Sequence, residues 1–137
     1  MPGVSDTGMF QESLERAGAD PRFLDVFYER FLAVSPEIAR VFEATDMERL
    51  KRKLKSTLHI VTLAVEQAPG ADLYLEYLGK VHGRLDIRPE FYALWLESLV
   101  QAAGECDPEF SPELKDVWLR VVGHAIEMMG PEGKGKG

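Results

Sequence analysis

A histidine closes an apolar stripe near the middle of the chain, and its side chain is the strongest candidate for metal chemistry. His82 follows Leu75 and Leu78 at the helical spacing i, i+3 and i+7, so the three residues share one face of a predicted helix. Neutral imidazole is the commonest protein ligand for a transition metal and a usual axial ligand of haem iron. Two interpretations stay open here: His82 ligates a metal, or it is a core histidine bonded to a backbone carbonyl.

Composition limits the classes of protein to which the chain could belong. Its 137 residues, of which 45% are apolar and 28% are charged, are typical of one soluble globular domain. The net charge of −7 argues against nucleic acid as the main partner. No apolar run reaches the roughly 18 residues of a membrane span, and the N-terminus lacks the pattern of a secretory signal. The sequence therefore predicts a cytoplasmic protein with neither a membrane nor a nucleic-acid partner.

The residues that usually perform hydrolysis or redox exchange are not arranged for it. Cys106 is the single cysteine, which rules out an internal disulfide, and its acidic neighbours disfavour a thiolate. We find no phosphate-binding glycine loop, no cysteine and histidine cluster with zinc spacing, and no local serine, histidine and acid motif. We therefore assign no catalytic residue. One basic run, residues 49–55, departs from the acidic balance, and we interpret it as a solvated helix face.

Helical patterns run through the whole chain and must position His82. Apolar spacing predicts helices over about 7–17, 21–34, 36–42, 46–65, 73–82, 89–103 and 112–128. Short polar residues mark several starts: Asp20, Ser35 and Ser111 each precede a proline, and Thr45 opens a capping box that Glu48 completes. The long helix that follows carries an apolar stripe through Leu50, Leu54 and Leu58. The helix over 89–103 is expected to turn Tyr92, Trp95, Leu96 and Leu99 inward.

Several residue types in register connect these helices to a known family. The motif Phe-Tyr-x-x-Phe occupies residues 27–31, Phe42 follows the short third helix, and Tyr92 stands ten residues after His82. Trp118 in the last helix fits the same pattern. Over residues 5 to 129 the chain resembles bacterial single-domain globins, whose globin part also occurs in flavohaemoglobins and globin-coupled sensors. The resemblance implies an all-α globin fold of about six to seven helices packed around a haem pocket.

The same resemblance implies how a cofactor would be held on the proximal side. His82 is then the axial ligand of the iron of haem b, iron protoporphyrin IX, and Phe42 wedges against the ring. Tyr92 lies near the histidine and can orient its imidazole, which a helix carbonyl could also do. Tyr92 could equally be an amphipathic core residue with its hydroxyl at the surface.

On the distal side the resemblance implies two aliphatic residues over the iron. Leu54 stands 28 residues before His82, where related globins place the inward aliphatic residue. Leu50, one turn earlier, stands where many globins have histidine or glutamine, so this chain departs from the common pattern. Leucine cannot donate a hydrogen bond, which leaves Tyr28 as the expected donor to a bound gas.

Three basic side chains have weaker expected roles near this pocket. Lys53 lies beside the distal stripe and could contact a haem propionate or remain solvated. Arg84 is a second candidate for a propionate. His59 lies about 140° around the helix from Leu54, at 100° per residue, and should face away from the haem.

The resemblance implies a haem-binding globin, covering residues 1–129, that reversibly binds O₂ together with NO and CO. Residues 130–137, rich in glycine and lysine, are expected to be a disordered tail. By default the protein binds oxygen; dioxygenation of NO would need a separate reductase, and gas sensing would need a separate signalling partner. The alternative is a haem-free globin-like helical module for protein interaction or stress sensing.

Overall fold

The computed structural model describes residues 2–65, 73, 76–77 and 89–135, with side chains over 6–62, 73, 76–77 and 90–127. The described residues form six α-helices and no strand, which confirms the predicted all-α class. The helices are α1 (Pro2–Ala19), α2 (Phe23–Val34), α3 (Pro36–Val41), α4 (Met47–Val65), α6 (Pro89–Cys106) and α7 (Pro112–Gly135). The predicted helix 73–82 lies mostly outside the described residues, although residues 73, 76 and 77 are helical.

Two of the expected helix caps are confirmed by hydrogen bonds. Ser35 Oγ accepts a bond of 3.1 Å from the backbone N–H of Glu37 at the start of α3. Ser111 Oγ accepts a bond of 3.2 Å from the backbone N–H of Leu114 at the start of α7. Each serine satisfies a backbone donor that the first helical turn leaves without a partner.

The cap of α4 lies one residue later than predicted. Asp46 Oδ1 accepts from Arg49 N at 3.2 Å, and the Asp46 carbonyl accepts from Leu50 N at 3.0 Å. Thr45 is instead held in the turn after α3, where its N–H donates to the Phe42 carbonyl at 3.1 Å. Asp46 therefore caps the helix, because its neighbour is already committed to the preceding turn.

The expected cap of α2 at Asp20 is also wrong. The helix begins at Phe23, its cap residue is Arg22, and no side chain caps it. Asp20 Oδ1 accepts from Arg22 N at 2.9 Å within the turn that precedes the helix. The Asp20 carbonyl accepts from Phe23 N at 3.0 Å, so this aspartate stabilises the turn and not the helix end.

Three helices are longer than the apolar pattern indicated. Helix α1 extends to Pro2 and Ala19, and α6 continues to Cys106, where Asp107 N still donates to the Ala103 carbonyl at 2.8 Å. Helix α7 continues to Gly135, beyond the predicted helix end near residue 128. Its glycines and lysines can bury no apolar face, which is why the pattern indicated an end near residue 128. The division into a domain and a separate tail stays a prediction.

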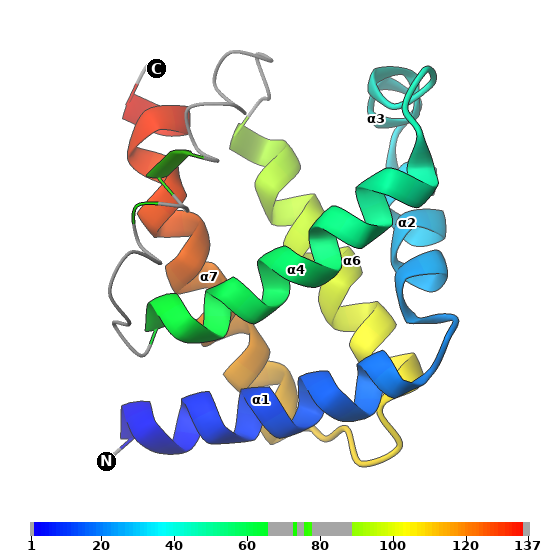
Figure 1. The fold of residues 1–137 in the computed structure, drawn as a ribbon. Helices are drawn as coiled ribbons and strands as arrows, with labels where there is room; N and C mark the ends of the chain where they lie inside the picture. The colour runs from blue at the N-terminus through cyan, green and yellow to red at the C-terminus, as the bar shows by residue number, and fades with distance from the viewer. Residues whose placement is uncertain (1, 66–72, 74–75, 78–88, 136–137) are drawn as a thin grey trace.

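The helices pack around one core, and several of them cross each other. Helix α1 lies mainly against α7, and α2 lies mainly against α6, which also packs on α7. Figure 1 shows α4 crossing obliquely over α6 and α7, with α1 along one side of the molecule. Fully buried side chains at the centre include Phe10, Phe27, Leu99, Val117 and Trp118. No helix among the described residues has the length and apolar character needed to cross a membrane.

The buried face of α6 is rotated slightly from the predicted one. Leu99 is fully buried as expected, but Tyr92, Trp95 and Leu96 are only half-buried. Phe91, Ala102 and Ala103 complete the buried face, together with Ser98, Val100 and Cys106. Helix α6 packs against α1, α2 and α7. It therefore buries a broader surface than a single stripe, and small residues allow the close approach.

A buried polar network ties α1 to the corner between α6 and α7. Ser13 Oγ donates to Asp107 Oδ2 at 2.6 Å and accepts from Trp118 Nε1 at 2.9 Å. Arg16 Nε donates to Asp107 Oδ1 at 2.7 Å. Burial alone would raise the pKa of Asp107, but hydrogen bonds from Arg16, Ser13 and Glu109 N outweigh it and lower that pKa.

Candidate functional site

Tyr28 on α2 is the best-placed polar group of the predicted distal site. Its side chain is only 6% exposed, and its ring lies 4.6 Å from that of Phe27 in an edge-to-face arrangement. Burial raises the pKa of Tyr28, so the phenol stays neutral and keeps its proton for donation. Within the described part of the chain, no group is hydrogen-bonded to its hydroxyl. The hydroxyl is the polar end of an otherwise buried side chain and can donate a hydrogen bond.

A row of aromatic rings connects Tyr28 to Phe42. The ring of Phe27 stacks on Phe31 at 5.8 Å, and Phe31 meets Phe42 at 6.0 Å with an interplanar angle of 65°. Trp95 of α6 contacts Phe27 from the other side at 5.6 Å. Phe42 is the cap residue at the end of α3 and remains half-buried. The edge of the row therefore keeps apolar surface that a flat apolar ligand could cover.

Helix α4 presents the predicted aliphatic residues to the same core. Leu54 is 7% exposed and belongs to the buried cluster that contains Tyr28, while Leu50 is half-buried and packs against that cluster. The next residues of the stripe, Leu58 and Val61, are buried as well. Tyr28 and Leu54 thus both belong to the one hydrophobic core, and Phe42 and Leu50 pack against it.

The remaining predicted site residues are more dispersed. Lys53 on α4 is exposed, and Tyr92 near the start of α6 is half-buried, with its pKa raised by burial. His59 is exposed, which agrees with its expected position away from the Leu54 face. His82 and Arg84 lie outside the described residues, so the proximal side of the site stays a prediction.

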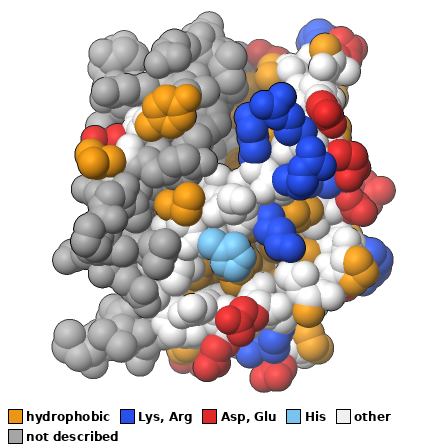
Figure 2. Space-filling view, viewed as in Figure 1, with side chains coloured by type: hydrophobic (Ala, Val, Ile, Leu, Met, Phe, Trp, Pro, Cys, Tyr) orange, Lys and Arg blue, Asp and Glu red, His pale blue; other side chains and the backbone are white. Residues whose placement is uncertain are grey.

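The basic run is solvated, as the sequence indicated, with one exception. Arg49, Arg52, Lys53 and Lys55 are exposed, and Figure 2 shows basic side chains gathered on the face that α4 presents. Lys51 is half-buried and pairs with Asp25 at 2.5 Å and with Glu48 at 3.0 Å. That pair to α2 was not predicted, because residues 26 positions apart meet only once the helices are packed.

Sequence reasoning also missed two features that support the site. Trp95 was expected in the core, but nothing local indicated that its ring would contact Phe27. The Asp107 network was missed because Ser13 and Asp107 are 94 residues apart. The only sequence signal for it is a charged residue directly after an apolar helix end, which is too common to be specific.

The predicted distal residues combine apolar surface with one polar group. Leu50, Leu54 and Phe42 supply the apolar surface, and Tyr28 supplies a neutral hydrogen-bond donor. No acid or base with this degree of burial accompanies Tyr28 among the predicted distal residues.

Comparisons with known proteins agree with this arrangement. The model of the globin family matches residues 25–129 of the chain. A crystal structure from Pseudomonas aeruginosa PAO1, of a protein described as structurally highly homologous to a human haemoglobin, is 35% identical in sequence to this chain. The match covers 93% of this chain and 97% of the Pseudomonas chain, with a TM-score of 0.87. No curated protein matches the sequence. The crossing helices, the extent of the family match and this structural similarity together show that the chain belongs to the globin family.

Proposed function

We propose that this globin holds haem b between α4 and the segment that contains His82 and binds a diatomic gas there, with O₂ as its main ligand. The observation that carries the proposal is the buried, neutral phenol of Tyr28 in one cluster with Leu54. Globins as a family bind haem, and the Pseudomonas relative is structurally highly homologous to a human haemoglobin. Ferrous haem, when bound, supplies an iron coordination position that a diatomic gas can occupy.

His82 is the proposed axial ligand, and helical geometry supports an inward position for it. Residues 73 and 77 are helical and exposed, at 64% and 56%. On an ideal helix with 100° per residue, positions 75, 78 and 82 stand on the side opposite to positions 73 and 77. A helix that continued from the described positions would therefore turn His82 away from solvent. Tyr92 is the proposed partner that orients its imidazole.

The distal residues have separate proposed tasks. Tyr28 donates a hydrogen bond to the gas, and Leu50 and Leu54 exclude water from the same space. Phe42 packs on the haem ring, and Lys53 pairs with a haem propionate from its exposed position. Because bound O₂ carries partial negative charge and CO carries less, a phenol donor favours O₂.

A titration with hemin tests the proposal. Purified protein mixed with increasing hemin should develop a sharp Soret band that saturates at one haem per chain. After reduction with dithionite, the band should shift when CO is added. A matched titration of Leu73→Ala, which changes an exposed position of the same segment, should give the same curve. Absence of a saturable band from the intact protein would instead favour the haem-free interaction module.

Reaction with NO is the finer part of the proposal. One pocket can serve O₂ storage, NO dioxygenation and gas sensing. Repeated NO dioxygenation requires electrons from a reductase, and gas sensing requires a signalling partner. Stopped-flow mixing of NO with haem-loaded, O₂-saturated protein measures whether nitrate forms faster than O₂ is released. Nitrate formation that is faster than O₂ release would support NO detoxification. Slower nitrate formation would favour O₂ storage or gas sensing.

A further inference from the structure

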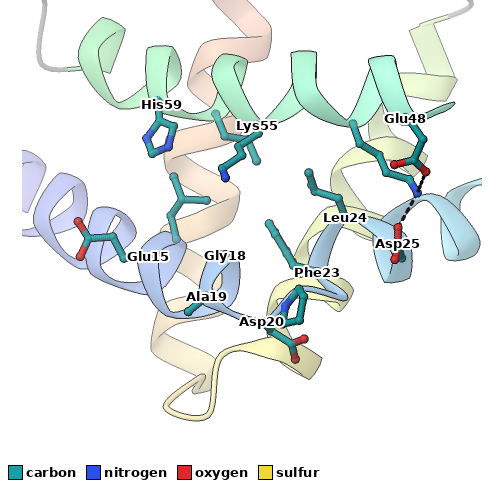
Figure 3. A pocket seen from close by; sticks show the side chains of 14 residues that line it. Glu15, Gly18, Ala19, Asp20, Phe23, Leu24, Asp25, Glu48, Lys55 and His59 are labelled. Atoms are coloured by element: carbon teal, nitrogen blue, oxygen red, sulfur yellow. Dashed lines mark hydrogen bonds and ion pairs between the residues drawn. The ribbon is translucent and has the colours of Figure 1, made fainter. Parts of the chain in front are cut away.

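A cavity opens on the outside of the fold, and its lining is separate from the residues proposed for gas binding. It has a volume of about 540 Å³ and is bordered by the end of α1, the start of α2 and one side of α4. Figure 3 shows the three helices around it. None of Tyr28, Phe42, Leu50 or Leu54 lines it. Its volume falls within the few hundred to about 1,000 Å³ typical of small-molecule sites.

The cavity exists because the end of α1 carries small residues beside an apolar floor. Gly18 and Ala19 line it, and a Cβ added at Gly18 would meet no atom within 4 Å. Beneath them Leu14, Phe23 and Leu58 are at most 7% exposed and supply the apolar surface. The space is therefore open at its rim and apolar at its floor, which suits a ligand with an apolar body.

The charged groups at the rim are mostly paired with each other. Lys51 is paired with Asp25 at 2.5 Å and with Glu48 at 3.0 Å. Asp20 is paired with Arg22 at 2.9 Å. These three acids therefore offer little attraction to a further cation, because each already has a basic partner.

Two basic side chains of α4 lack such partners within the described residues. Lys55 and His59 are exposed, line the cavity, and make no ion pair or hydrogen bond with another described group. Figure 3 shows both side chains extending from α4 toward α1 and α2. The opposing acid is Glu15 of α1, whose carboxylate points away from Lys55 in the same view.

We propose that this cavity binds a free medium-chain monocarboxylate. The carboxylate lies between the ammonium of Lys55 and the ring N–H of His59, which are one helical turn apart on the same side of α4. The alkyl chain extends over Phe23, Leu24 and Leu14 toward the open space at Gly18. The proposal does not depend on haem, because the gas-binding residues do not line this cavity.

Binding is tested by titrating the protein as purified, and again after hemin is added, with decanoate below its critical micelle concentration. Amide and imidazole NMR shifts identify the location. We expect saturable shifts at His59 and at Gly18 in both forms, while acetate and decanol, which supply only the head or the tail, bind at least about tenfold more weakly. Shifts at Leu54 and Tyr28 that vanish when hemin is added would place decanoate in the gas pocket and overturn the proposal. If no haem binds, only the gas-binding proposal fails.

Two pairs of variants distinguish a specific loss of decanoate binding at the cavity from a general effect on the protein. Gly18→Leu fills the cavity and should weaken decanoate binding at least about tenfold, whereas Gly8→Leu, on the same helix and equally open, should leave it unchanged. Lys55→Gln should weaken binding about two- to fivefold, as expected for a solvated charge pair, whereas Lys115→Gln on α7 should not. Far-ultraviolet circular dichroism confirms that each variant is folded.

The proposal would be contradicted if the controls Gly8→Leu and Lys115→Gln weakened decanoate binding as much as Gly18→Leu and Lys55→Gln do. Tighter binding of decylammonium than of decanoate would also contradict it, and would show that Glu15 and the paired acids determine the charge of the ligand.

Discussion

Tyr28 is the only hydrogen-bond donor among the residues predicted to lie over the iron. Its side chain combines a buried ring, packed edge to face on Phe27, with a phenol whose pKa is raised by burial. Neither Leu50 nor Leu54 can donate a hydrogen bond, so any hydrogen bond from the predicted distal set must come from this phenol. The family resemblance predicted that Tyr28 donates a hydrogen bond to a bound gas, and the structure shows that its side chain is buried. The role of its hydroxyl remains a prediction.

We expect Tyr28→Phe to increase the rate of O₂ dissociation at least about tenfold. A hydrogen bond to a charged acceptor contributes about 1.5–3 kcal/mol, which corresponds to one to two decades in affinity. Stopped-flow displacement of O₂ by CO measures the rate in haem-loaded protein. Tyr77→Phe is the matched control, because Tyr77 is 56% exposed, and its rate should equal that of the wild type. An unchanged rate in Tyr28→Phe would show that the phenol does not reach the gas.

Single residues also mark the limits of sequence reasoning. Lys55 and His59 belong to a basic and polar helix face, and nothing local indicates that this face borders a cavity. That cavity depends on Gly18, which stands in another helix and contributes by its lack of a side chain. Burial of Leu54 was predictable because periodicity reports one helix face, whereas a cavity needs the relative position of three helices.

At the scale of helices, several starts were predicted correctly to within a few residues, but not always the residue that caps them. Ser35 and Ser111 cap their helices as expected, but α4 is capped by Asp46 and not by Thr45. Both residues are good caps, and the choice depends on the turn after α3, where Thr45 N donates to Phe42. Residue propensities predict where a helix starts to within a residue or two. Which of the neighbouring residues caps the helix depends on the preceding turn.

The assignment of Asp46 as the cap of α4 can be tested by a pair of substitutions. Asp46→Ala should lower the free energy of unfolding by about 1 kcal/mol, because Arg49 N loses its acceptor at the start of α4. Thr45→Ala should change it by less than about 0.5 kcal/mol. Urea unfolding followed by circular dichroism measures both values. A larger loss in Thr45→Ala would show that the threonine is the cap after all.

The contact of α1 with the corner between α6 and α7 should be sensitive to acid. The side chain of Asp107 is fully buried, and its pKa in the folded protein is lowered from the ordinary value of 3.8. A carboxyl with a lowered pKa stabilises the fold above its unfolded pKa, and the contribution is lost as pH falls through the folded pKa. Stability from this network should therefore be complete near neutral pH and should decline below about pH 4.

We expect Asp107→Asn to lower the free energy of unfolding by about 1–3 kcal/mol at pH 7, since the partner groups in the buried network lose a charged acceptor. The deficit should shrink as pH is lowered toward 3, because the wild-type carboxyl then becomes protonated. Urea unfolding at a series of pH values provides the measurement. Asp6→Asn, which breaks an exposed pair with Arg120, should cost less than about 1 kcal/mol. A deficit independent of pH would mean that the Asp107 charge is not what stabilises the contact.

At the scale of the whole molecule, the all-α class and the globin fold could be predicted from residue periodicity and a few residues in register. The structure and the comparisons confirm both. The arrangement of α4 over α6 and α7 places the aliphatic stripe of α4 in the same core as Tyr28 (Figure 1). What could not be predicted are the contacts between distant segments, such as Ser13 with Asp107 or Lys51 with Asp25, because they depend on how helices dock.

The proposed haem binding depends most on His82, and replacing the His82 side chain by free imidazole tests the proposed ligation directly. His82→Gly should lose the reduced, gas-free absorption spectrum of the wild type, because no side chain remains to ligate the iron. Adding free imidazole should restore that spectrum, since a small molecule can occupy the vacated space. A His82→Gly protein with the wild-type spectrum in the absence of imidazole would contradict the proposed ligation.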